Sequence, residues 1–170
     1  MHDAGLFRDE RVELLDGEII AMSPQNPPHV SSVGRLNRVL MRLLGDRYTL
    51  RVQAPVRLDA RSEPEPDLAI CTFDPDDYEG GHPTPEQILL LIEVSDSSLA
   101  FDRKRKRPAY ARAGIAEYWI VNVPDRIVEV SQRPDRGASR YRVSRRARPG
   151  EVLTLPDGAT VRVADLVPRR

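Results

Sequence analysis

Two short apolar runs constrain the fold of this chain more than any other feature. In residues 88–94 and 118–123, large apolar side chains follow one another almost without a polar break. Runs of this length and composition are typical of central strands that are covered on both faces. Between them, residues 102–113 predict a helix that ends at Gly114. The chain is therefore expected to form a sheet with helices packed on it.

Shorter patterns extend this arrangement toward the N-terminus. Residues 12–15 and 18–22 flank an Asp-Gly pair, which is a strong hairpin signal. Residues 29–44 carry apolar side chains at helical spacing and predict an amphipathic helix that stops at Gly45. Arg35, Arg38 and Arg42 would share the opposite face of this helix.

The remaining segments complete a mixed sheet. Residues 50–59 alternate between apolar and polar side chains, so they predict a half-buried strand, with Pro55 at an edge or a bulge. Further short strands are predicted at residues 68–72, 126–131, 140–144, 152–155 and 160–163. The expected fold class is α/β (α+β): one domain over residues 1–170, with a mixed β-sheet flanked by helices and a β-hairpin toward each end.

Composition excludes little and favours a soluble cytoplasmic protein. The 26 basic and 26 acidic residues cancel, so net charge gives no argument for nucleic acid or for a membrane. No segment approaches the roughly 18 consecutive apolar residues of a membrane span. Cys71 is the only cysteine, which rules out an internal disulfide and fits a reducing cytoplasm.

Two acids at the polar edges of apolar stretches carry the chemical signal. Asp67 precedes Leu68–Ile70, and Glu93 follows five apolar residues. Carboxylates at such positions provide the hard oxygen ligands that Mg²⁺ or Mn²⁺ prefers. A buried carboxylate is costly without a partner or a metal. The residues alone also allow a turn aspartate at 67 and a strand-end salt bridge at 93.

A basic block follows these acids in the chain. Residues 103–107 are all lysine or arginine, and such a run is usually a solvated helix face, although it also suits a phosphate-binding edge. Lys106 lies four residues before Tyr110, so it is expected to point inward while Lys104 points to water. His29 and Glu13 are weaker candidates for the same site, since each also suits an ordinary structural or surface position.

Several stretches taken together resemble the Uma2 family (DUF820), bacterial proteins placed among the PD-(D/E)XK restriction-endonuclease-like folds. The stretches that carry the resemblance are Pro66-Asp67, Glu93-Val94-Ser95, Asp102–Lys106, Tyr110–Ile115 and Glu117–Val121. The opening hairpin and the segment from Met22 to His29 are also similar to the start of that family. The resemblance runs to about Tyr141 and is most specific between Tyr110 and Val121.

The resemblance implies a site as well as a fold. Asp67 and Glu93 would be metal ligands for Mg²⁺ or Mn²⁺, and Lys106 would complete the catalytic set. The usual pattern has lysine two residues after the glutamate, where this chain has Ser95, so the lysine role would pass to the following helix. Pro108 conflicts with that placement, because proline inside a helix removes a backbone donor and clashes with the preceding turn. The helix should then begin near Arg107 or be kinked.

The function implied by the resemblance is metal-dependent hydrolysis of DNA phosphodiester bonds. His29 and Glu13 would share the cleft, and Arg103, Arg105 and Arg107 would contact the DNA backbone without reading bases. One alternative is a catalytically inactive module that binds nucleic acid or protein. Another is a hydrolase of a different phosphate ester. Proteins of this fold often form homodimers, but no interface is identifiable from the sequence.

Overall fold

A six-stranded mixed sheet forms the centre of the computed structural model, which describes residues 11–168. The strand order is β3-β4-β5-β6-β7-β8. The strands are β3 (Tyr48–Val52), β4 (Leu68–Thr72), β5 (Ile88–Ser95), β6 (Glu117–Asn122), β7 (Ile127–Asp135) and β8 (Arg140–Ala147). Strands β5 and β6, which correspond to the two apolar runs, pair in parallel, and the other neighbours are antiparallel. The mixed sheet predicted from the sequence is confirmed.

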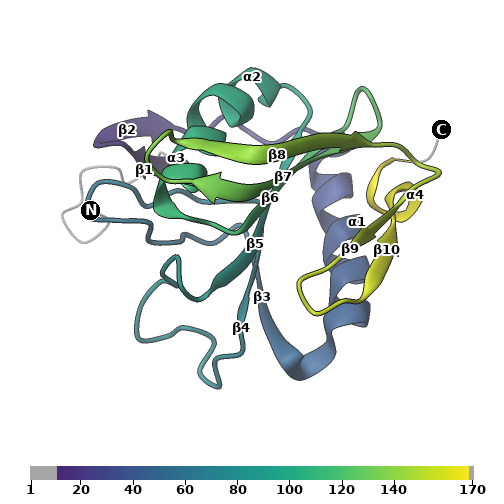
Figure 1. Cartoon of the computed structure of the whole chain (residues 1–170), viewed down its shortest axis with the longest axis horizontal. Helices are drawn as coiled ribbons and strands as arrows, with labels where there is room; N and C mark the ends of the chain where they lie inside the picture. The colour runs from purple at the N-terminus through teal and green to yellow at the C-terminus, as the bar shows by residue number, and fades with distance from the viewer. Residues whose placement is uncertain (1–10, 169–170) are drawn as a thin grey trace.

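The two faces of the sheet bury two separate hydrophobic clusters. On one face, α1 (Pro27–Leu44) packs over Leu90, Ile92 and Trp119, together with the C-terminal segment. On the other face, α3 (Arg107–Ala113) packs over Leu91 and Tyr118. Figure 1 shows α1 beside the yellow C-terminal segment, with α2 and α3 across the sheet from it. Because side chains alternate along a strand, residues 91, 93 and 95 face the α3 side.

The predicted hairpins are both present. Strands β1 (Val12–Leu15) and β2 (Glu18–Ala21) pair around Asp16 and Gly17, whose φ values of 57° and 82° suit the tight turn. Toward the C-terminus, β9 (Val152–Thr154) pairs with β10 (Thr160–Arg162), and the short helix α4 (Val163–Leu166) follows directly. The second hairpin and α4 pack on the α1 side of the sheet through the buried side chains of Leu153, Val161 and Leu166.

Two predicted boundaries need correction. The strand expected over residues 50–59 begins at Tyr48 and ends at Val52, because Gln53 adopts a positive φ of 49° that breaks the extended backbone. The first helix begins two residues earlier than predicted: Asn26 caps it, and its side chain accepts a hydrogen bond from the His29 backbone N–H. Both prolines at its start occupy the first helical turn, where no donor is needed.

The helical segment around Pro108 also differs from the prediction. It begins at α2 (Leu99–Phe101), continues as a π-helical segment η3 (Asp102–Lys106) and ends as α3. The Arg107 backbone N–H donates to the Asp102 carbonyl, five residues back. This wider turn precedes Pro108 and leaves room for a residue that has no backbone donor. The continuous helical stretch therefore begins at Leu99, and α-helical geometry resumes at Arg107 after the π segment.

Candidate active site

A cleft of about 330 Å³ lies where β4 and β5 emerge beside the start of α1 and the π segment. All five residues proposed from the sequence line it: Glu13, His29, Asp67, Glu93 and Lys106. They come from β1, α1, the entry to β4, β5 and η3, which are distant in the sequence. The loop between β2 and α1, from Met22 to Asn26, forms part of the wall.

Asp67 and Glu93 are neighbours across two antiparallel strands. Leu68 pairs with Ile92, so the register extended by one residue places Asp67 opposite Glu93. Directly opposite residues project from the same face of a sheet. The Asp67 carboxylate is fixed there because its Oδ2 accepts a hydrogen bond of 2.7 Å from the Val94 backbone N–H. The sheet itself therefore brings the two acids together.

Lys106 lies between two glutamates. Its Nζ is 3.0 Å from Glu93 Oε1 and 3.1 Å from Glu13 Oε2. The Tyr110 hydroxyl donates to the same Glu93 Oε1 at 2.8 Å. Tyr110 lies one helical turn after Lys106, so the same helix face supplies both donors. The inward direction predicted for Lys106 agrees with this geometry.

His29 contacts the other acid. Its Nε2 lies 2.9 Å from Asp67 Oδ1, and the Gln53 side-chain amide donates to that oxygen at 3.3 Å. The hydrogen bond to Asp67 raises the pKa of His29 above its ordinary value, although burial opposes it. The first turn of α1 thus holds an imidazole against one of the two carboxylates.

The cleft holds a fourth buried carboxylate, Asp102, to which the sequence analysis gave no role in the site. Its Oδ2 accepts hydrogen bonds from Ser95 Oγ at 2.5 Å and Ser98 Oγ at 2.7 Å. Burial raises the pKa of Asp102, while Lys106 and the two serines oppose the shift. The available signal was its spacing, four residues before Lys106 on the same helix face. Ser95, which stands where the family pattern has lysine, is one of its partners.

The acids outnumber the cations in this cleft. Burial raises the pKa of Glu93 well above its usual range, against the lowering effect of Lys106, and Asp102, Asp67 and Glu13 add to the rise. Burial lowers the pKa of Lys106, but the surrounding carboxylates outweigh it and raise that pKa overall. Burial is the first cause of the Glu93 shift, and the neighbouring carboxylates add to it; the same group of carboxylates causes the Lys106 shift. A further cation near Glu93 would relieve this repulsion.

The donor set suits a divalent ion that keeps most of its water. Within residues 11–168, no group of three or more His, Cys, Asp or Glu side chains is arranged as a ready-made metal site. Mg²⁺ is commonly held by only one or two carboxylates, with waters and substrate phosphates completing its shell. Two carboxylates on one face, in a cleft with excess negative charge, meet that requirement. Asp67 and Glu93 therefore fit Mg²⁺ or Mn²⁺ as a pair.

A family model described as "Putative restriction endonuclease", Uma2, matches residues 3–165 of the chain. The chain belongs to the Uma2 family. Its fold is similar to that in the crystal structure of "a putative nuclease belonging to DUF820" from Anabaena variabilis. The two chains share 12% sequence identity, with a TM-score of 0.68 over 93% of this chain and 90% of that one. No curated protein matches the sequence.

The Uma2 match and the shared fold place the chain among restriction-endonuclease-like proteins. Two of the three arginines expected to contact DNA are engaged within this Uma2 structure: Arg103 forms an ion pair with Glu129, and Arg105 lies 2.6 Å from Glu18. In the described part of the chain, no helix is long and apolar enough to cross a membrane.

Proposed function

We propose that the protein is a metal-dependent nuclease that hydrolyses DNA phosphodiester bonds at the cleft between β4, β5 and the π segment. The observation that supports this most is the convergence of Asp67, Glu93 and Lys106 from three separate segments on one cleft. The family and the fold are those of restriction-endonuclease-like proteins, which agrees with this chemistry.

Asp67 and Glu93 would hold Mg²⁺ or Mn²⁺. When bound, the metal would polarise the scissile phosphate and activate a water molecule for attack. Asp67 is prepared for this role because the Val94 backbone N–H and His29 fix its two oxygens. Glu93 keeps Oε1 on Lys106 and Tyr110, and within residues 11–168 its Oε2 accepts no hydrogen bond. Oε2 is the oxygen proposed to face the ion.

Lys106 would stabilise negative charge on the phosphate and help to orient the attacking water. Its ammonium is preorganised, because Glu93 and Glu13 hold it from two sides. Charge that is held in place in this way stabilises a transition state more than a flexible surface lysine does. Glu13 would act as a positioning residue through Lys106, and His29 as a positioning residue through Asp67.

The direct test is a nuclease assay with Mg²⁺ or Mn²⁺ on supercoiled, linear and single-stranded DNA. We expect cleavage by the wild-type protein, no cleavage in EDTA, and a loss of at least about a hundredfold in Glu93→Ala and Asp67→Ala, in line with the usual contribution of metal and positioned catalytic groups. Glu79→Ala is the matched control, because it removes one exposed carboxylate that does not line the cleft. Equal activity in the Glu93→Ala and wild-type proteins would reject the proposal.

A second function, a catalytically inactive module that binds nucleic acid or protein, has one observation in its favour. Lys106 is engaged by two glutamates, and both oxygens of Asp67 accept hydrogen bonds within the protein. A site closed in this way can serve stability alone. This alternative predicts salt-dependent binding without turnover, and no change in binding for Asp67→Ala.

A further inference from the structure

A second concave surface lies between α1 and the C-terminal segment of β10 and α4, and arginines line it. Arg35, Arg38 and Arg42 stand at positions i, i+3 and i+7 of α1, so they fall on one side of the helix. The rise of the helix spreads them over about 10 Å along its axis. This row was visible in the sequence, and the cleft chemistry uses none of it.

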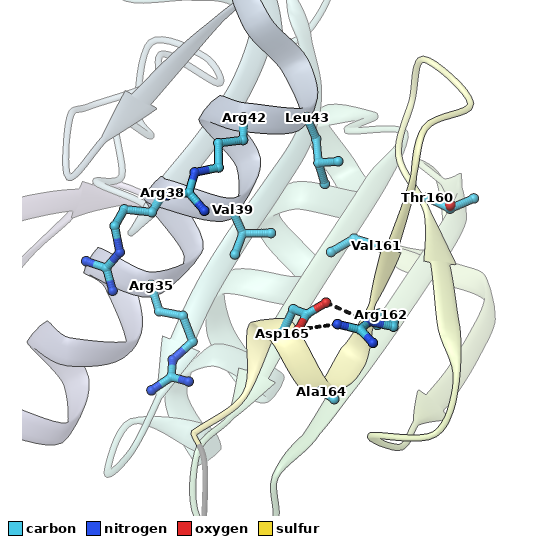
Figure 2. Close-up of a pocket in the computed structure, with 10 residues that line it drawn as sticks. All are labelled: Arg35, Arg38, Val39, Arg42, Leu43, Thr160, Val161, Arg162, Ala164 and Asp165. Carbon is cyan, nitrogen blue, oxygen red and sulfur yellow. Dashed lines mark hydrogen bonds and ion pairs between the residues drawn. The ribbon is translucent and has the colours of Figure 1, made fainter.

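The row borders a cavity of about 740 Å³, here called the arginine groove and defined by Arg35, Arg38, Val39, Arg42, Val161 and Arg162. Figure 2 shows the three α1 arginines along one side, Val39 and Val161 between the two walls, and Arg162 with Asp165 on the other side. Arg162 is bound to Asp165 through contacts of 2.9 and 3.1 Å. The groove therefore has an apolar floor and a strongly cationic wall.

The three α1 arginines lack a neutralising partner in the part of the chain that the structure describes. Among residues 11–168, none of the three forms an ion pair. Arg35 Nε is buried and has no hydrogen-bond partner there, which is a costly arrangement unless a ligand supplies an acceptor. Arg103 and Arg105, by contrast, are paired with Glu129 and Glu18. Within residues 11–168, three guanidinium groups without an ion pair therefore share one side of α1 at this groove.

We propose that the arginine groove binds the phosphate backbone of the DNA on which the protein acts, at a position outside the scissile phosphate. This inference rests on the proposed function for its choice of ligand. One strand of DNA carries a phosphate about every 3.4 Å of helix axis, so the 10 Å row matches about three phosphates. Guanidinium groups bind phosphate oxygens in a bidentate manner. The groove would bind without reading sequence.

The position of the row suits a flanking contact. Arg35 lies six residues after His29, which corresponds to about 9 Å along α1, and Arg42 lies about 20 Å along it. The first turn of α1 borders the catalytic cleft through His29, while its last turns carry the groove. A single helix thus links the two sites at a fixed distance.

The test is DNA binding by the full chain in EDTA, where cleavage cannot interfere. Fluorescence anisotropy with a labelled 20-base-pair duplex would be measured between 50 and 300 mM salt. For R35A/R38A/R42A we expect a loss of affinity of about tenfold or more at 100 mM salt, and a salt slope smaller by about 2 to 3. The variant R38A/R42A changes only exposed residues and should lower the salt slope by about 2. Because it keeps the partly buried Arg35, it remains informative if the triple variant fails to fold.

Two control variants separate local from general charge effects. R140A/R146A/R148A removes three exposed arginines on and next to β8, and should leave the affinity within about threefold of the wild type. R35K/R38K/R42K keeps the charge, so it should keep most of the salt slope while losing bidentate contacts. Equal losses in the α1 and β8 triple variants would overturn the proposal.

The ligand and the catalytic proposal are tested separately. Inorganic pyrophosphate that binds the groove as tightly as the duplex would overturn the assignment to a nucleic-acid backbone, and so would tighter binding of a polyglutamate peptide. Loss of DNA binding in the α1 variants, together with no cleavage by the wild type in Mg²⁺, would reject the nuclease and support the groove. Cleavage by the wild type, together with unchanged DNA binding in the α1 variants, would support the nuclease and reject the arginine groove as a DNA-binding surface.

Discussion

Lys106 Nζ lies 3.0 Å from Glu93 Oε1 in the interior of the protein, where 6% and 5% of the two side chains are exposed. The pair joins the π segment to the central strand β5. Two opposite charges at this depth cost desolvation energy, and their attraction repays it only when both remain present. The pair is therefore a point at which stability and the proposed chemistry depend on the same atoms.

Replacing Lys106 by methionine should destabilise the protein strongly at pH 7. The substitution keeps most of the side-chain volume but leaves Glu93 and Glu13 without their shared cation. Breaking a buried pair in this way costs about 3–5 kcal/mol. Urea unfolding followed by circular dichroism measures the loss. Lys104→Met is the matched control, because Lys104 is exposed two residues earlier; similar stabilities of the two variants would show that the buried pair is not important.

Asp102→Asn should increase stability at neutral pH relative to the wild type. The pKa of Asp102 is raised, first by burial, so the folded state binds its proton more tightly than the unfolded state does. Its contribution to stability is therefore present at low pH and is lost as the pH rises above the unfolded value of about 4. Asparagine can still accept from Ser95 and Ser98 and carries no charge.

Thermal unfolding between pH 3 and pH 8 tests whether the stability contribution of Asp102 is lost as the pH rises. The Tm of Asp102→Asn should exceed that of the wild type at pH 7, and the difference should shrink toward pH 3. Asp76→Asn is the control, since Asp76 is exposed in the loop after β4. A difference that instead grows on acidification would mean that Asp102 is held as a stabilising carboxylate.

The sheet was predictable because its strands carry strong local patterns. The apolar runs at β5 and β6 allow only buried strands, and the Asp-Gly turn leaves few alternatives to the first hairpin. The end of β3 was not predictable. Residues 50–58 keep alternating in polarity after the backbone turns at Gln53, so the pattern continued through a segment that is not a strand.

The candidate site was predictable only in part, for a different reason. Asp67 and Glu93 stand at strand ends, where their types alone draw attention. Asp102 lay hidden in a charged run, because its burial depends on Ser95 and Ser98 from neighbouring segments. Pro108 made the inward direction of Lys106 doubtful from the sequence. The π turn that resolves the conflict could not be predicted, because it has no sequence signature as clear as a cap or a hairpin.

His29→Ala should weaken metal binding about 10–100-fold, the usual effect of removing a group that orients a metal ligand. The imidazole holds Asp67 Oδ1 at 2.9 Å, and without it the carboxylate loses a fixed orientation. Isothermal titration calorimetry with Mn²⁺ measures the change. His82→Ala, which alters a histidine outside the cleft lining, should bind Mn²⁺ like the wild type. Unchanged Mn²⁺ affinity in His29→Ala would separate His29 from the site.

Cys71 should resist thiol reagents in the folded protein. Burial raises the pKa of its thiol to about 12, although the charge of Arg51 opposes the rise. The reactive thiolate is then scarce at pH 8, and the side chain is also shielded in β4. Labelling with Ellman's reagent should be negligible in buffer and complete within minutes in denaturant. Fast labelling of the native protein would show that β4 opens readily.

Tyr110→Phe should cost about 1.5–3 kcal/mol, the usual contribution of a hydrogen bond to a charged group. The lost hydroxyl is one of the two donors that hold Glu93 Oε1, while the ring still fills the cluster between the sheet and α3. Tyr118→Phe is a close control: it is equally buried, but its hydroxyl makes only a 3.5 Å contact with the Asp102 carbonyl. Urea unfolding should show a clear loss of stability for Tyr110→Phe and a smaller loss for Tyr118→Phe.

If the proposed function is right, Tyr110→Phe should also slow DNA cleavage more than Tyr118→Phe does, because Glu93 would turn more freely in the cleft. Equal effects of the two substitutions on stability and on cleavage would show that the hydroxyl of Tyr110 does not orient Glu93.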